Sequence, residues 1–161
     1  KSIYTFHGRR AERMKAGRHH NVYLSQQALD ILVAFKTCFG ASSYLHPGRY
    51  ETTLPISAAT LNRVIDVTVE LIRDRGEDFE PFTVHDLRRT ASTLLHEAGF
   101  NSDWIEKCLA HEQRGVRAVY NKAEYAEQRR TMMQSWADML DEWIRNGGNV
   151  VPIRRQATAL A

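Results

Sequence analysis

The chain has 161 residues, of which 43% are hydrophobic and 25% are charged. This balance is typical of a globular domain and excludes a disordered or fibrous protein. No stretch approaches the roughly 18 apolar residues of a transmembrane helix, and the first residues lack the layout of a signal peptide. Cys38 and Cys108 lie in apolar stretches, which argues against a disulfide scaffold and for a reducing cytoplasm. Because the first residue is lysine, we expect the chain to be part of a longer protein.

The formal net charge is only +3, but the charged residues are unevenly distributed. Residues 7–20 read HGRRAERMKAGRHH and contain five Lys or Arg, three His and one acid. Such a run either binds phosphate groups or forms the solvated surface of a hairpin, and charge alone leaves both open. Acidic residues gather elsewhere, at Asp138, Asp141 and Glu142. We therefore expect basic and acidic residues to lie on different sides of the protein.

The first part of the chain predicts a hairpin and two helices. Residues 2–6 and 19–24 are rich in β-branched and aromatic residues, which predicts two strands joined by a turn at residues 15–18. Ser25 is the expected N-cap of a helix that Gly40 ends. Residues 41–56, with two prolines, predict a loop, and a 3.6-residue apolar period predicts a second helix over residues 57–75.

The rest of the chain predicts only helices. Thr83 and Asp86 resemble a capping box, with Asp in place of the usual Glu or Gln, and open a helix that stops at Gly99. Asn101 or Ser102 caps a short helix that follows. Two more helices are expected over residues 113–121 and 124–145.

These elements predict an α+β, mainly α fold with a small sheet at its start. We expect one domain over residues 1–148 and a flexible tail over residues 149–161. The last helix carries an apolar stripe, which is most simply explained by core packing. Its members are Met132, Met133, Trp136, Met139, Leu140, Trp143 and Ile144.

Two local patterns could carry chemistry. His85 and Arg88 lie three residues apart at a helix start, and therefore on one helix face. Arg offers a planar fork of donors for phosphate oxygens, His can move a proton near neutral pH, and a helix N-terminus favours an anion. Alone, such a pair is a weak signal, and an ordinary surface pair is the favoured interpretation.

The second pattern is His111 followed nine residues later by Tyr120. A tyrosine near basic residues can act as a nucleophile on a phosphodiester, because cations ease the loss of its proton. Alone, Tyr120 is better explained as a packing residue. Tyr125 is a rival nucleophile, but the spacing from His111 favours Tyr120.

A metal site is not expected from the spacing of potential ligands. His19 and His20 are adjacent and would point to opposite faces of a strand. No Cys or His pair has the spacing of zinc ligands. Asp86 and Glu97 do not form the carboxylate cluster that a metal-dependent nuclease would need.

Taken jointly, the segments HDLRRTASTLLHEAGF, LAHEQ and VRAVYN resemble the catalytic core of tyrosine recombinases, above all that of phage and genomic-island integrases. The family pattern is an HxLR box, a Leu-Gly-His box and a tyrosine nine residues later. Ala110 stands where the family usually has Gly, which affects a turn. Lys15 matches a catalytic lysine in the family's hairpin turn, and Tyr23 stands where many relatives have Pro. The resemblance covers about residues 10 to 143.

The resemblance implies site-specific DNA recombination or integration by strand cleavage and rejoining through a 3′-phosphotyrosine, without ATP, metal or other cofactor. Tyr120 would be the nucleophile, Arg88 would stabilise the phosphate, and Lys15 would protonate the leaving oxygen. His85 would assist proton transfer, and His111 would hydrogen-bond the phosphate. The implied fold is the recombinase catalytic domain, a hairpin packed on a helical bundle.

Other basic residues are candidates for contacts with double-stranded DNA at attachment sites. They are Arg13, Arg18, Arg89 and Arg117. Arg89 is turned about 100° from Arg88 around the helix, so a plain surface role stays open for it.

The resemblance also implies an assembly. We expect a homotetramer on DNA, a monomer without DNA, no membrane association, and action at the nucleoid in the bacterial cytoplasm. For the apolar stripe on the last helix, the alternative to core packing is that it docks onto a neighbouring protomer.

One expected residue is not in this sequence. The family places a first catalytic arginine upstream of the hairpin, and Arg9, Arg10 and Arg13 lie within or beside the hairpin instead. We therefore expect this chain alone to be impaired or inactive in cleavage. The alternative function is a DNA-binding module without catalysis, such as a decayed integrase.

Overall fold

The computed structural model describes residues 3–5, 20–40, 42–111 and 123–147. The chain divides into two compact units. One contains residues up to 30 together with those from 95 onward, and the other contains residues 31–94. The expected hairpin turn at residues 15–18, the expected helix over residues 113–121 and the expected tail lie outside the described residues.

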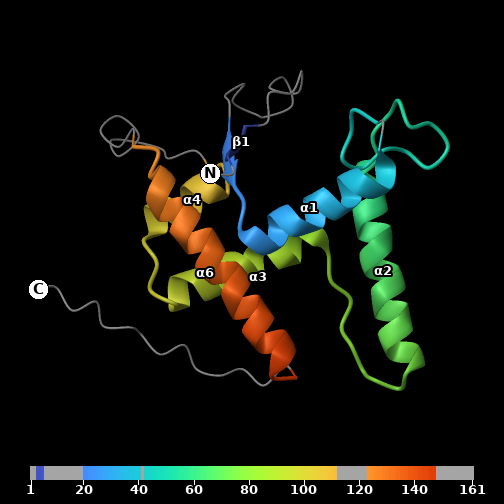
Figure 1. Cartoon of the computed structure of the whole chain (residues 1–161). Helices are drawn as coiled ribbons and strands as arrows, with labels where there is room; N and C mark the ends of the chain where they lie inside the picture. Colours follow the sequence, from blue (N-terminus) through green and yellow to red (C-terminus); the bar gives the residue numbers. More distant parts are fainter. Residues whose placement is uncertain (1–2, 6–19, 41, 112–122, 148–161) are drawn as a thin grey trace, which may run out of the picture. The chain divides into compact units, whose positions relative to one another are not determined.

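The first unit contains a two-stranded sheet and two helices (Figure 1). Strands β1 (Ile3–Thr5) and β2 (Asn21–Tyr23) pair antiparallel, with Ile3 opposite Tyr23. Helix α4 (Ser102–Cys108) and helix α6 (Ala126–Arg145) contact each other, and α6 also contacts β2. Both strands lie within the segments that the sequence indicates, residues 2–6 and 19–24.

The core of this unit forms where α4 and α6 meet the end of α3 (Val84–Glu97). Leu95, Ile105 and Met132 are its buried members, and Met132 is 0% exposed. Half-buried apolar side chains surround them: Phe100, Trp104, Cys108, Leu109, Met133, Trp136 and Met139. Burial of apolar surface of this kind is the main favourable contribution to folding.

The stripe on α6 divides along its length. Trp136 packs against the core, and its ring meets Trp143 edge to face with 5.8 Å between the ring centroids. Further along, Ile144 is 77% exposed. Core packing therefore explains the first part of the stripe, and docking of the remainder onto another protomer stays a prediction.

Side-chain amides join the start of α1 (Gln26–Phe39) to α6. The Gln26 backbone N–H donates to Gln134 Oε1 at 2.8 Å, and the Gln27 amide donates to Asp138 Oδ1 at 2.9 Å. Ser25 accepts from the Ala28 backbone N–H at 3.2 Å, as expected of an N-cap. The donated hydrogen bonds from Gln27 and Gln134 hold the pKa of Asp138 below its usual range.

The second unit contains the remainder of α1, helix α2 (Ala58–Asp74) and the start of α3. Ser57 is the N-cap of α2, but its side chain makes no capping hydrogen bond. The apolar period correctly predicts this helix, yet only Ile65 and Val69 of α2 are buried. Other apolar side chains of this unit are exposed, among them Leu61, Val64 and Leu71. Arg73 ties the helix to the chain beyond it, because its guanidinium donates to the Phe79 carbonyl.

The loop between α1 and α2 contains one small pairing that the sequence does not indicate. Pro47 and Pro55 form an antiparallel bridge, and the Gly48 N–H donates to the Leu54 carbonyl at 2.7 Å. A Cβ on Gly48 would lie 2.9 Å from the Glu51 carbonyl oxygen, so glycine is needed at this turn. No helix in the described part of the chain is long and apolar enough to cross a membrane.

Candidate functional site

The start of α3 is fixed by reciprocal hydrogen bonds. The Thr83 backbone N–H donates to Asp86 Oδ2 at 3.0 Å, and the Asp86 N–H donates to Thr83 Oγ1 at 3.3 Å. The Thr83 hydroxyl also donates to the same carboxylate at 2.8 Å. These bonds from Thr83, with smaller contributions from Arg89 and His85, hold the pKa of Asp86 below its usual range. The capping box expected from the sequence is confirmed, and Asp performs the role of the usual Glu.

His85 and Arg88 are both exposed, one helical turn apart at this capped end of α3. Arg89 has an ionic partner on its own helix, since its guanidinium lies 3.0 Å from Asp86 Oδ1. The Arg89 side chain is still 74% exposed, so its guanidinium also remains accessible from solvent. The α3 end therefore presents an imidazole and a guanidinium to solvent at a helix N-terminus, which is a favourable arrangement for an anion.

His111 lies directly after α4, in the first unit, where the chain turns sharply. Ala110 has a left-handed backbone with φ of 53°. The Ala110 N–H donates to the Lys107 carbonyl at 3.2 Å, and the His111 N–H donates to the Glu106 carbonyl at 3.0 Å. This pair of bonds is the Schellman motif. The His111 ring then meets the Glu106 carboxylate, with Nδ1 at 2.7 Å from Oε2.

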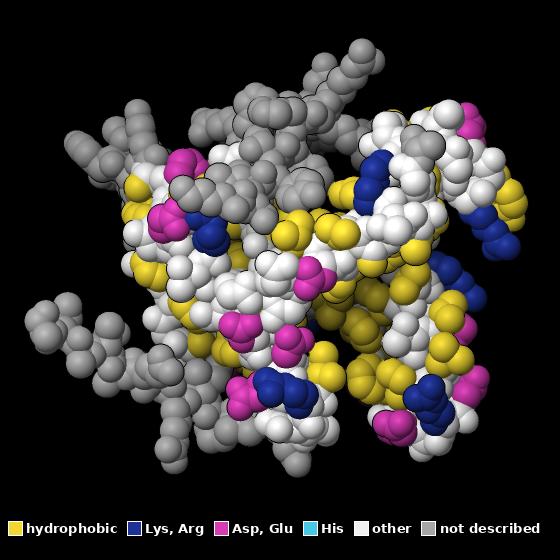
Figure 2. Space-filling model, viewed as in Figure 1, with side chains coloured by type: hydrophobic (Ala, Val, Ile, Leu, Met, Phe, Trp, Pro, Cys, Tyr) yellow, Lys and Arg dark blue, Asp and Glu magenta, His cyan; other side chains and the backbone are white. Residues whose placement is uncertain are grey.

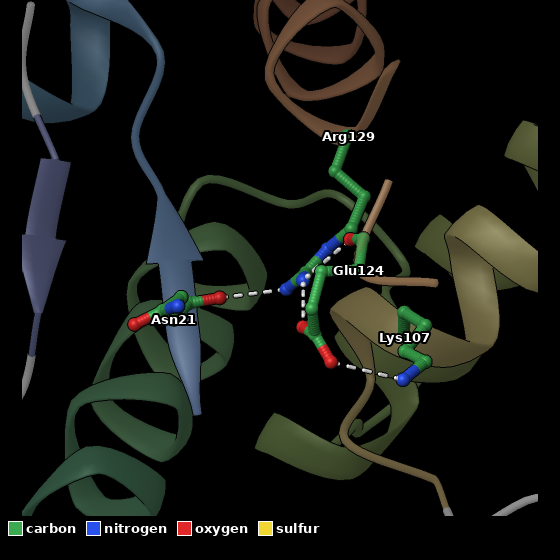
Figure 3. Close-up of polar contacts among 4 residues, drawn as sticks. All are labelled: Asn21, Lys107, Glu124 and Arg129. Carbon is green, nitrogen blue, oxygen red and sulfur yellow. Dashed lines mark hydrogen bonds and ion pairs between the residues drawn. The ribbon is translucent and has the colours of Figure 1, made fainter. Parts of the chain in front are cut away.

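A charged cluster lies beside this turn and joins β2, α4 and α6 (Figure 3). Lys107 Nζ lies 3.1 Å from Glu124, and the Arg129 guanidinium lies 3.5 Å from the other oxygen of the same carboxylate. Arg129 also donates to the Asn21 carbonyl at 2.6 Å and is 1% exposed. Buried charges are tolerated where partners of this kind exist.

Tyr23 completes the environment of this cluster. Its ring is 5% exposed, and the guanidinium carbons of Arg129 and Arg130 lie 4.8 Å and 5.2 Å from the ring centroid. Stacking of arginine on an aromatic face adds a cation–π attraction. The Tyr23 ring thereby adds a second attachment of β2 to the first turns of α6, beside the hydrogen bond from Arg129 to Asn21.

Acidic side chains gather over the C-terminal half of α6 on the face shown in Figure 2. The sequence places Asp138, Asp141 and Glu142 in this half. Like charges repel the phosphates of DNA, so this part of α6 is unsuited to lie along a duplex.

Five of the nine predicted site residues lie outside the described residues: Arg13, Lys15, Arg18, Arg117 and Tyr120. Of the remaining four, the structure places His85, Arg88 and Arg89 together on α3, and His111 after α4. The rival tyrosine, Tyr125, is half-buried and serves as the N-cap residue of α6 with a φ of 50°. Among the described residues, no three His, Cys, Asp or Glu form a group suited to a metal ion.

The family model of the phage integrase family matches residues 2–127. This chain belongs to the phage integrase family. It is 40% identical over 141 residues to the prophage integrase IntZ of Escherichia coli K12, which covers 86% of this chain and 33% of that protein. It is also 40% identical over 131 residues to the prophage integrase IntA of the same organism (81% and 30%), and 34% identical over 134 residues to the integrase of Shigella phage Sf6 (82% and 33%). The chain thus spans about a third of the length of these curated relatives. No solved structure matches it significantly.

The backbone at Ala110 shows what its departure from the Leu-Gly-His box affects. Integrases usually have Gly at the middle of the Leu-Gly-His box, and the backbone here is left-handed, a conformation that glycine adopts without cost. The departure therefore affects the turn that presents His111 and not a reacting group, as expected from the sequence.

The integrase motifs do not predict the contacts made by four charged residues near His111: Glu106, Lys107, Glu124 and Arg129. Residues five apart on a continuous helix point in directions about 140° apart, so spacing alone does not bring Glu106 to His111. Only the left-handed turn at Ala110 does so. Lys107 and Glu124 are 17 residues apart, and arginine is rarely buried, so neither partner of Glu124 follows from a periodic pattern.

Proposed function

We propose that this chain is the catalytic part of a site-specific DNA recombinase that cleaves and rejoins strands through a 3′-phosphotyrosine. One observation carries the proposal: a chain 40% identical to a prophage integrase has Lys, His-x-x-Arg, His and Tyr at the spacing of the recombinase motifs. A protein that only binds DNA does not need this combination. The exposed pair His85 and Arg88 on the capped end of α3 supports a phosphate-binding role.

In the proposed reaction, the hydroxyl of Tyr120 attacks the scissile phosphate. The Tyr–O–P bond forms, the bond to the 5′-oxygen breaks, and a free 5′-hydroxyl leaves. His85 accepts the tyrosine proton, and Lys15 donates a proton to the leaving oxygen. Arg88 and His111 stabilise the charge that builds on the non-bridging oxygens. The energy of the phosphodiester is retained in the phosphotyrosine, so no step consumes ATP or uses a metal.

The proposal includes the finer fold and the partners. The β1–β2 pair and the helices would form the recombinase catalytic-domain fold, with the strands as parts of one hairpin. The partner is double-stranded DNA at attachment sites, contacted also by Arg13, Arg18, Arg89 and Arg117. The protein would be monomeric without DNA and tetrameric on it, and would act at the nucleoid in the bacterial cytoplasm.

The test uses the full-length gene product and a nicked suicide duplex built from the ends of its own mobile element. Wild-type protein should give a covalent protein–DNA band on a denaturing gel, because the nicked product cannot be rejoined. Tyr120→Phe should bind the same duplex with unchanged affinity and give no band. Tyr125→Phe is the matched control and should give the wild-type band.

A band with Tyr120→Phe would contradict the assignment of the nucleophile. Binding without any band from the wild-type protein would contradict catalysis and favour a decayed integrase that only binds DNA.

A further inference from the structure

The turn after α4 brings two parts of His111 to the same residue. The backbone N–H of His111 donates to the Glu106 carbonyl at 3.0 Å, and the ring Nδ1 lies 2.7 Å from the Glu106 carboxylate. The two side chains are 51% and 38% exposed, so the pair lies at the surface, where a duplex can reach it. A histidine held at both its backbone and its ring has lost most of its rotational freedom.

We propose that Glu106 is a positioning residue for His111. Its carboxylate selects which ring nitrogen of His111 meets the scissile phosphate. The proposal rests on the proposed recombinase function. A carboxylate only accepts hydrogen bonds, so the contact requires a proton on Nδ1. Nε2 is then the nitrogen left to contact DNA.

The number of protons on the His111 ring determines whether it can bond to Glu106 and to a phosphate at the same time. A hydrogen bond to a phosphate oxygen needs a proton on Nε2, and the bond to Glu106 needs one on Nδ1. Both are satisfied only by the doubly protonated ring, whose positive charge is offset on one side by Glu106 and on the other by the phosphate. Glu106 therefore aims the ring, with Nδ1 toward its own carboxylate and Nε2 toward the phosphate.

Lys107, the residue next to Glu106, has a different partner, so the contact made by Glu106 can be tested separately from the contact made by Lys107. Lys107 lies 3.1 Å from Glu124, whereas Glu106 lies against His111. The adjacent charges on α4 thus serve different contacts, one structural and one at the candidate site. Glu106 can be replaced without removing a member of the Lys107, Glu124 and Arg129 cluster.

The first test observes the ring directly, without DNA cleavage. The protein is labelled with ¹⁵N in its histidine rings, and the His111 signals are assigned by their loss in His111→Ala. In the wild-type protein Nδ1 should carry a proton. In Glu106→Ala the neutral ring should revert to the more common form with the proton on Nε2, whereas Glu106→Gln should retain the Nδ1 proton, because its amide oxygen still accepts. An identical ring spectrum in Glu106→Ala and wild type would overturn the proposal.

The second test is a double-mutant cycle on covalent-adduct formation with the nicked duplex. Glu106→Ala should slow adduct formation by about tenfold or more, by analogy with the loss of a hydrogen-bond partner that orients a metal-ligating histidine. His111→Ala should slow it by about 10²-fold. In the His111→Ala background, Glu106→Ala should have no further effect, and Glu106→Gln should restore most of the rate in the wild-type background. Glu142→Ala, an exposed acid on α6, is the control and should react as wild type.

Additive losses in the double mutant would overturn the proposal, because Glu106 would then act independently of His111. A wild-type protein that forms no adduct would overturn the proposed function itself. The ring spectrum would in that case still decide whether Glu106 orients His111.

Discussion

Helices α3 and α4 end in the same hydrogen-bond pattern but have different residues in the left-handed position. Gly99 has φ of 82° at the end of α3, where the Phe100 N–H donates to the Leu95 carbonyl at 3.1 Å. Ala110 has φ of 53° at the end of α4. A left-handed L-residue costs about 1–2 kcal/mol, so α4 retains a strain that α3 avoids.

We expect Ala110→Gly to raise the free energy of unfolding by roughly 0.5–1 kcal/mol. The relieved strain of about 1–2 kcal/mol is partly offset by about 0.4–1 kcal/mol of extra unfolded-chain entropy. Urea denaturation measures the change, and Gly99→Ala is the reverse control, which should destabilise the protein. A loss of stability in Ala110→Gly would show that the methyl group of Ala110 makes a compensating contact.

At the scale of the element, the capping box of α3 couples helix stability to pH. The hydrogen bonds from Thr83 lower the pKa of Asp86 in the folded chain. The unfolded chain therefore takes up the proton at a higher pH than the folded chain does. The stabilisation is complete above the ordinary Asp pKa of about 3.9, and is lost as pH falls through the lower pKa of the folded state.

We therefore expect the stability difference between wild type and Asp86→Asn to shrink as pH is lowered from about 5 to about 2, because only the wild type loses a charged cap. Chemical denaturation across this range measures it. Thr83→Ala removes the hydrogen-bond partner, so in that background Asp86→Asn should have a much smaller pH-dependent effect. An undiminished difference at low pH would contradict the coupling.

The helices could be predicted because their ends are marked by local chemistry. Ser25, Thr83 with Asp86, and Asn101 mark starts, and Gly40 and Gly99 mark ends, so the predicted and observed bounds agree closely. The contacts of His111 and Arg129 could not be predicted, because they depend on how turns and distant segments of the chain come together in the fold. The contact between Glu106 and His111 needs the left-handed Ala110, and the burial of Arg129 needs Tyr23 and Asn21 from a distant strand.

At the scale of the whole molecule, the net charge of +3 conceals a basic N-terminal run and an acidic half of α6. DNA binding that is driven by the release of counterions depends on the basic residues that contact phosphates, and not on the net charge of the protein. The basic run should therefore determine affinity, and basic residues within the acidic part of α6 should contribute little.

We expect the double substitution Arg13→Ala/Arg18→Ala to weaken binding to a duplex and to reduce the slope of log affinity against log salt by about 2, because each arginine would neutralise one phosphate. Fluorescence anisotropy over a series of salt concentrations measures both quantities. Arg145→Ala, an exposed residue at the acidic end of α6, is the matched control and should leave affinity and slope unchanged. Equal effects of both variants would contradict the assignment of the basic run.

Tyr23 has a consequence for how the sequence can change over time. Its ring contacts Arg129 and Arg130 of α6, whereas the family resemblance described above leads us to expect proline at this position in other integrases. A proline would remove the surface on which both guanidiniums lie. Arg129 would retain Glu124 and Asn21, whereas Arg130 would retain only its bond to Glu127 among these contacts. In evolutionary terms, we expect a replacement of Tyr23 to remove one reason to keep arginine at position 130.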